Sequence, residues 1–178
     1  ISSDEDWRVN EGPIVFNGTR SGETYDAGSE LDGWSEPGYA DANWCRAARV
    51  CGPGGTLKAQ MLPPIKVART IEPVAVNEVK PGTFVVDLGE NIAGWAQLRV
   101  SGEQGTEVTM RYSEHVNDEG GVDRSNIEGS IKGVPFQTDR YVLRGKDMET
   151  FEPRFTYHGF RYIEVTGFPG TLTKDNIQ

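Results

Sequence analysis

The chain has 178 residues, of which 36% are hydrophobic, 10% are aromatic and 22 are glycine; this length suits one large or two small domains. Its formal net charge is −9 at pH 7, so nucleic acids and anionic membranes, which are themselves negative, are poor partners. No apolar run approaches the roughly 20 residues of a transmembrane helix. We therefore expect a protein that neither binds nucleic acid nor enters a membrane.

Residues 1–50 contain short apolar stretches separated by turn residues. Residues 7–9 and 14–16 fit two short strands on either side of Gly12-Pro13. The chain begins at Ile1 without an initiator methionine, which is expected of a piece cut from a longer chain. We predict a partial β segment at this end.

The candidate ligand site of this segment is the group Glu23, Tyr25 and Asp26. An aromatic ring offers an apolar face that suits a pyranose, and neighbouring carboxylates accept sugar hydroxyls or ligate calcium. Packing of Tyr25 in a core is an almost equal alternative. We predict weak sugar binding here, with no cofactor other than calcium to consider.

Cys45 and Cys51 are six residues apart. A disulfide and two free thiols both agree with this spacing, and free thiols are slightly favoured. No histidine is near enough in sequence to suggest a zinc site. Two cysteines leave periplasmic, secreted and cytoplasmic locations open.

Glycine and proline are concentrated in residues 51–64. Pro63-Pro64 favours an extended backbone that lacks donors for a sheet. We therefore predict a linker at 51–64, which separates residues 1–50 from a domain at 65–178.

From residue 65 onward, segments of β-type composition follow one another, with turn residues between them. They are 67–71, 74–79, 83–88, 95–100, 107–112, 138–144 and 161–166. Polar and apolar residues alternate along 107–112, which is typical of a sheet with one wet face. We predict an all-β, mainly antiparallel β-sandwich without a long helix, and a barrel is the alternative. The expected interior residues are Phe84, Val86, Leu98, Val108, Met110, Val142 and Ile163.

The longest gap between predicted strands is 113–137, which contains the acids Asp118, Glu119, Asp123 and Glu128. Acidic loops suggest calcium, but this spacing does not fit the twelve-residue hand loop. A solvated loop is the favoured interpretation.

Two stretches combine strand composition with glycine breaks. In 84–95, FVVDLGENIAGW, alternation predicts a strand as far as Leu88 and then a short turn bracketed by Gly89 and Gly94. In 155–165, FTYHGFRYIEV, the glycine at 159 predicts a bulge or a close backbone approach.

Three long segments, FVVDLGENIAGWAQLRVSG, EVTMRYSEHVNDEGG and FEPRFTYHGFRYIEVTGFPG, together resemble the β-sandwich domain of bacterial α-L-rhamnosidases. The resemblance covers residues 60–170 and implies a jelly-roll or concanavalin-like sandwich that precedes a catalytic helical barrel. In addition, GETYDA and PGYADANW resemble the end of the preceding lectin-like module. In some family members that module binds sugar with the help of calcium.

Glycoside hydrolysis usually needs an acid and a base on two carboxylates. The chain has 27 acidic residues, but its pattern fixes no such pair, and the resemblance places both groups on the barrel. The sequence also lacks a Gly-x-Ser-x-Gly elbow and a phosphate-binding loop. We therefore expect no catalytic residue in this chain, although the parent protein would be an α-L-rhamnosidase.

Trp95, His158 and Arg161 are the candidate contacts with the catalytic barrel. The alternatives are core packing or stacking on a sugar ring for Trp95, a hydrogen bond to a neighbouring strand for His158, which is favoured, and an ion pair across the sheet for Arg161. We also expect an exposed apolar patch near Trp95 or residues 157–160.

We thus predict a non-catalytic β-sandwich fragment that braces the catalytic helical-barrel domain of the same polypeptide. It would also help to bind rhamnose-containing glycans. The alternative is a free-standing carbohydrate-binding module.

Overall fold

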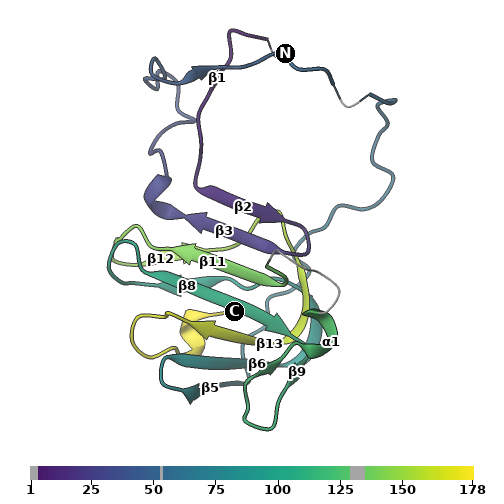
Figure 1. Cartoon of the computed structure of the whole chain (residues 1–178), viewed down its shortest axis with the longest axis vertical. Coiled ribbons are helices and arrows are strands. Elements are labelled where there is room, and N and C mark those ends of the chain that lie inside the picture. The colour runs from purple at the N-terminus through teal and green to yellow at the C-terminus, as the bar shows by residue number, and fades with distance from the viewer. Residues whose placement is uncertain (1–3, 53, 129–134) are drawn as a thin grey trace. The chain divides into compact units, whose positions relative to one another are not determined.

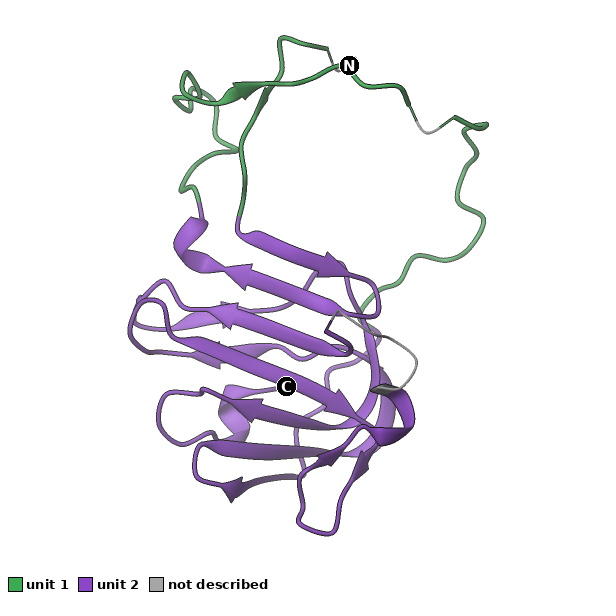
Figure 2. Cartoon of the chain, in the orientation of Figure 1, with its two compact units in different colours: residues 1–12, 31–67 green, residues 13–30, 68–178 purple. Residues whose placement is uncertain are grey.

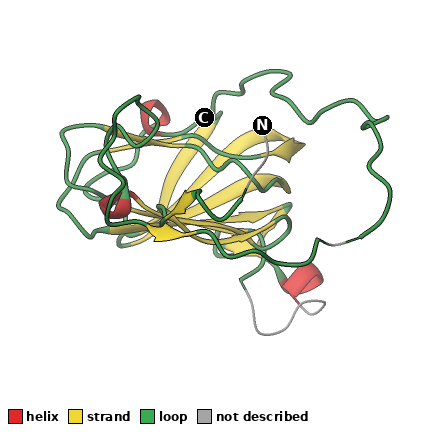
Figure 3. Ribbon diagram, turned by 90° about the horizontal axis from the view of Figure 1, so that it is seen from above, coloured by secondary structure: helices red, strands yellow, loops and turns green. Residues whose placement is uncertain are grey.

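The computed structural model describes residues 4–52, 54–128 and 135–178. Strands dominate these residues, and helices are short (Figures 1 and 3). The helical pieces are α1 (Ser125–Glu128), η1 (Ala27–Ser29) and η2 (Lys174–Asn176). Within the described residues, no helix combines the length and the hydropathy that crossing a membrane requires. The predicted all-β fold is confirmed.

Two compact units divide the chain (Figure 2). The smaller consists of residues 1–12 and 31–67, where β1 (Arg8–Val9) pairs antiparallel with β4 (Cys45–Arg46). None of its described residues is buried. Cys45 and Cys51 are both free and exposed. The predicted division at 51–64 stays a prediction.

The larger unit, residues 13–30 and 68–178, is built on one seven-stranded sheet. Its strands, in spatial order, are β2 (Ile14–Gly18), β3 (Gly22–Asp26), β11 (Thr138–Val142), β8 (Glu107–Ser113), β13 (His158–Thr166), β6 (Thr83–Gly94) and β5 (Ala75–Lys80). All neighbours are antiparallel except β3 and β11, which are parallel.

Two smaller pairs complete this unit. They are β7 (Leu98–Val100) with β12 (Glu149–Phe151), and β9 (His115–Val116) with β10 (Val122–Asp123). The second pair and α1 lie in the segment predicted as a solvated loop.

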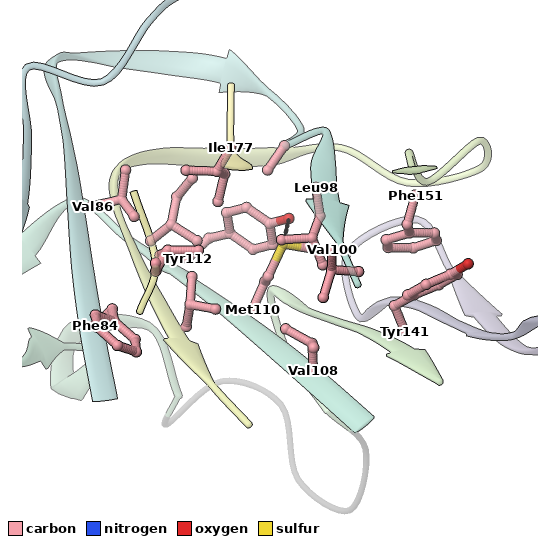
Figure 4. Close-up of a cluster of buried hydrophobic side chains, with 14 of the residues drawn as sticks. Phe84, Val86, Leu98, Val100, Val108, Met110, Tyr112, Tyr141, Phe151 and Ile177 are labelled. Carbon is pink, nitrogen blue, oxygen red and sulfur yellow. Dashed lines mark hydrogen bonds between the residues drawn. The ribbon is translucent and has the colours of Figure 1, made fainter. Parts of the chain in front are cut away.

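The core lies between the large sheet and the β7–β12 pair. Along β8, Val108, Met110 and Tyr112 are fully buried, because successive side chains alternate between the two faces of a strand. They meet Leu98, Val100 and Phe151 from the opposite layer and Ile177 from the C-terminal segment (Figure 4). Two β layers around an apolar interior confirm the predicted sandwich.

Of the interior residues predicted from sequence, Val142 is wrong. It is only partly buried and lies on the strand face opposite Asp139 and Tyr141, which point inside. The charged Asp139 takes an inward position on β11, so hydropathy alone assigns the faces of this strand incorrectly.

The turn predicted after Leu88 is also wrong, because β6 continues to Gly94. Phe160 faces Ile92 and Tyr162 faces Asp87, so the four residues 88–91 of β6 lie opposite the single residue Arg161 of β13. Gly89, at φ +79°, allows this bulge. The irregularity of β13 therefore lies two residues beyond Gly159, and residues 67–71 form no strand.

Candidate functional site

A cluster of buried polar side chains crosses four adjacent strands of the large sheet. Glu23 lies on β3, Asp139 on β11, Tyr112 on β8 and His158 on β13, and each is at most 1% exposed. Buried polar groups are costly unless they are paired, so the partners within this cluster determine what it can do.

Asp139 is the centre of the cluster. Its Oδ1 accepts the backbone N–H of Glu23 at 2.8 Å, and its Oδ2 accepts the Tyr112 hydroxyl at 2.7 Å. His158 Nε2 lies 3.1 Å from the same Oδ2. An ionised carboxylate only accepts hydrogen bonds, which makes Nε2 the protonated nitrogen.

Tyr112 connects the cluster to the core. Its ring stacks on His158 at 4.3 Å between centroids and meets Phe160 edge-on at 4.6 Å. Burial, followed by the negative charge of Asp139, raises the pKa of the Tyr112 hydroxyl well above its ordinary value. The phenol therefore remains a hydrogen-bond donor.

Glu23 links the sheet to the loop that precedes β13. Its Oε2 accepts the backbone N–H groups of Arg154 at 3.3 Å and Phe155 at 3.4 Å, and the Asn17 amide at 3.3 Å. Burial raises the pKa of Glu23, and these hydrogen bonds oppose the shift only in part. Burying the ionised form of Glu23 therefore costs free energy, and the same carboxylate holds this loop in place through its hydrogen bonds.

The three residues predicted to bind sugar are not brought together. Glu23 is inside, whereas Asp26 lies on the opposite face of β3, because the two are an odd number of positions apart. Asp26 caps η1 by accepting hydrogen bonds from Gly28 N at 2.9 Å and Ser29 Oγ at 3.1 Å.

Tyr25 shares the face of Glu23 and packs inward. Its ring lies 5.9 Å from that of Tyr141 and 5.8 Å from that of Phe151, and its hydroxyl donates to Glu30 at 2.8 Å. All these contacts are structural. Sugar binding by Glu23, Tyr25 and Asp26 therefore stays a prediction that the geometry does not favour.

The described residues contain no group of three or more His, Cys, Asp or Glu side chains arranged to hold a metal ion. In the acidic loop, Asp123 accepts the backbone N–H of Ser125 at 2.9 Å, and Glu119 pairs with Lys80 at 3.4 Å. The side chain of Glu128 lies outside the described part. Calcium binding stays a prediction.

The three predicted interface residues differ in exposure. Trp95 is partly buried and donates Nε1–H to Glu152 at 2.8 Å, whereas His158 is inside the sandwich. His158 is paired with Asp139 on β11, which is separated from β13 by β8, so the favoured alternative holds for the hydrogen bond but not for the neighbouring strand. An interface role for His158 stays a prediction.

Arg161 pairs across the sheet with Asp87. Its Nε and Nη2 lie 2.8 and 2.9 Å from the two carboxylate oxygens, and these hydrogen bonds lower the pKa of Asp87. The guanidinium also lies 5.0 Å over the Tyr162 ring. An interface role for Trp95 or Arg161 stays a prediction.

Two exposed aromatic residues stand beside the polar cluster. Phe155 is 61% exposed and Tyr157 is 43% exposed, while Thr156 and His158 between and after them are buried. The Thr156 hydroxyl donates to the carbonyl of Thr19 at 3.1 Å. Within 157–160, Tyr157 is partly exposed and Phe160 is fully buried, so the predicted apolar patch stays a prediction.

Sequence reasoning missed the roles of Asp139 and Tyr112. The signal in the sequence was the position of Asp139, which alternates with Tyr141 on the inward face of its strand. An acid at an inward position needs a buried hydrogen-bond partner.

Two family models match the chain. The bacterial alpha-L-rhamnosidase concanavalin-like domain matches residues 77–178, and the alpha-L-rhamnosidase N-terminal domain matches residues 1–69.

Curated relatives with similar sequences are much longer than this chain. It is 46% identical to an alpha-L-rhamnosidase of Streptomyces avermitilis and 37% identical to one of Formosa agariphila, in each case over 99% of its own length. It spans only 17% and 18% of those two proteins.

Solved structures agree with this comparison. The crystal structure of the Streptomyces avermitilis alpha-L-rhamnosidase complexed with L-rhamnose matches with a TM-score of 0.93 at 43% identity. The alpha-L-rhamnosidase of Dictyoglumus thermophilum matches with a TM-score of 0.91 at 39% identity. Each alignment covers 99% of this chain, and 17% and 20% of the two structures.

Proposed function

The chain belongs to the bacterial alpha-L-rhamnosidase family. We propose that it is a non-catalytic part of a longer rhamnosidase polypeptide. Its role is to brace the region that carries the chemistry. The supporting observation is that almost the whole chain aligns with less than about a fifth of each relative. A free-standing carbohydrate-binding module is a poorer account of that alignment.

The internal chemistry of the sandwich supports the same proposal. Hydrolysis needs two carboxylates about 5–10 Å apart on opposite sides of a bound sugar. The buried carboxylates Glu23, Asp139 and Glu149 instead accept hydrogen bonds from their own chain. They stabilise strands and turns rather than face a substrate.

The direct test is to incubate the purified 178-residue chain with an aryl α-L-rhamnoside, with the longer polypeptide as the positive control. We expect release of the aryl group from the longer polypeptide only. Turnover by the short chain that disappears when one exposed carboxylate is replaced, for example in Glu114→Gln, would contradict the proposal.

Assistance in glycan binding is the second part of the proposal. L-rhamnose is the ligand to test, because the similar Streptomyces avermitilis enzyme was solved in complex with it. The chain is titrated with L-rhamnose, with and without calcium, and we expect weak, saturable changes in its spectroscopic signal. Binding through Glu23, Tyr25 and Asp26 predicts smaller changes in the Asp26→Asn variant. If rhamnose produces no shift, the bracing role alone remains.

A further inference from the structure

Phe155 and Tyr157 form what we call the aromatic pair, and its combination of exposure and rigidity needs an explanation. The two side chains are 61% and 43% exposed, and Thr156 between them is 6% exposed. Both rings are therefore exposed within three residues of the start of β13, with a buried threonine between them.

The backbone beneath the aromatic pair is fixed at three points. Glu23 accepts the N–H groups of Arg154 and Phe155, and Thr156 is tied to the β2–β3 turn through Thr19. Beyond the pair, His158 is held by Asp139. Exposed loops are normally more mobile than this, with fewer such contacts.

Fixing this segment has a cost, since it requires the buried carboxylate of Glu23. A rigid display of exposed aromatic rings is the arrangement that favours binding, because little conformational entropy remains to be lost. Aromatic residues are also the commonest anchors of protein interfaces.

We propose that the aromatic pair is the surface through which this sandwich packs against another part of its own polypeptide, outside residues 1–178. This inference rests on the proposed function. The relatives leave room for such a partner, since the chain spans only 17% to 20% of their length. A covalently attached partner meets the pair at high effective concentration, so a small contact is sufficient.

A protein surface fits the pair better than a glycan does. Sugar recognition combines ring stacking with hydrogen bonds to hydroxyls. Around the pair, the Asn17 amide donates to Glu23 and the Thr156 hydroxyl donates to Thr19, so these polar groups are already engaged. The predicted partner is therefore an apolar pocket of the polypeptide.

Hydroxyl-radical footprinting of the full-length polypeptide tests this inference. For each residue, the labelling rate in the native protein is divided by its rate in the urea-unfolded protein. Phe160 and Tyr112, both fully buried, are the matched protected references, and Met148, 55% exposed, is the open reference. We expect Phe155 and Tyr157 to be protected like Phe160 and Tyr112, without sugar and independently of protein concentration.

Three results would overturn the inference. Labelling of the pair at the relative rate of Met148 would show an open surface. Protection that requires L-rhamnose would assign the pair to a glycan, and protection that grows with protein concentration would assign it to a second copy. If residues near Trp95 and Arg161 are protected instead, the bracing function stands and only this surface is rejected.

A variant measurement completes the test. In the full-length polypeptide, the double substitution Phe155→Ser and Tyr157→Ser should lower the unfolding temperature of the region outside residues 1–178, whereas Met148→Ser should not. An equal effect of the two changes would contradict a specific contact.

Discussion

Asp139 shows how one residue can hold several strands together. Its carboxylate receives hydrogen bonds from β3, β8 and β13 while it sits on β11. Removing a buried acceptor leaves each donor unsatisfied, and this penalty exceeds the net gain from forming the same bonds.

We expect Asp139→Ala to lower the free energy of unfolding by about 3 kcal/mol or more, because three donors lose their acceptor inside the core. Asp118→Ala removes the same group from an exposed loop position and should change stability by less than about 0.5 kcal/mol. Urea unfolding of the two variants checks this. Similar losses would mean that Asp139 is not the centre of the network.

Glu149 is the second carboxylate that organises its surroundings. Its Oε2 accepts the Tyr141 hydroxyl and the Arg144 N–H, and its Oε1 accepts the N–H groups of Gly145 and Lys146, all at 2.8–3.0 Å. Burial alone would raise the pKa of Glu149, but these hydrogen bonds outweigh it and place the pKa below the ordinary value of 4.5.

A lowered carboxyl pKa gives stability that is present above pH 4.5 and is lost as the pH falls through the folded-state pKa. Glu149→Gln should therefore cost about 1–3 kcal/mol at pH 7, and its difference from the parent should shrink in acid. The urea midpoints of the parent and of Glu149→Gln are compared at pH 7 and in acid below pH 4.5, with the exposed Glu103→Gln as the control. If the stability difference between parent and variant stays constant or widens in acid, the pKa of Glu149 is not lowered by folding.

Glu23 has the opposite linkage to pH. Its pKa is raised, so its ionisation opposes folding as the pH rises above 4.5. Sequence reasoning selected Glu23 as a sugar ligand because an acid beside a tyrosine resembles a binding site. Whether such an acid faces water or the core depends on the pairing of its strand, and β3 pairs with β11, whose Asp139 is 116 positions away along the chain.

At the scale of elements, most strands of the large sheet were predictable from composition, but residues 67–71 form no strand, and β9, β10 and β12 were not predicted. The alternation along β8 placed its faces correctly, because every buried residue there is apolar up to Tyr112. β6 was predicted to end at Leu88, but pairing with β13 carries it through a four-residue bulge to Gly94. The pairing of β6 with β13 cannot be predicted from the residues around Leu88. This long-range pairing extends the strand where the glycines predicted a turn.

The turn after β13 provides a prediction at this scale. Gly167 has φ +74°, and a Cβ there would lie 2.1 Å from the carbonyl oxygen of Glu107. Gly105 has φ +82° with open space around it. Gly105→Ala should cost about 1–2 kcal/mol from backbone strain alone, and Gly167→Ala should cost clearly more.

The melting temperatures of the two alanine variants separate the two effects. Both variants have backbone strain from a positive φ, but only Gly167→Ala also places a Cβ against the Glu107 carbonyl oxygen. Equal melting temperatures would imply that the turn at Gly167 moves away from β8 without penalty.

At the scale of the whole molecule, family resemblance was more informative than residue chemistry. Three ordered segments identified the sandwich, and the comparisons confirm the family over residues 77–178. The smaller unit, residues 1–12 and 31–67, has no buried residue among those described. Within it, Tyr39 packs against Trp44 at 5.6 Å between ring centroids, and the Trp34 side chain is 63% exposed.

We propose above that the chain braces the catalytic region of a longer polypeptide without taking part in its chemistry. The most direct measurement is the unfolding temperature of that region in the full-length polypeptide and in a version that lacks residues 1–178. We predict a lower unfolding temperature in the shortened protein, because the surface that the sandwich covers becomes exposed to water. An unchanged unfolding temperature would contradict the claim.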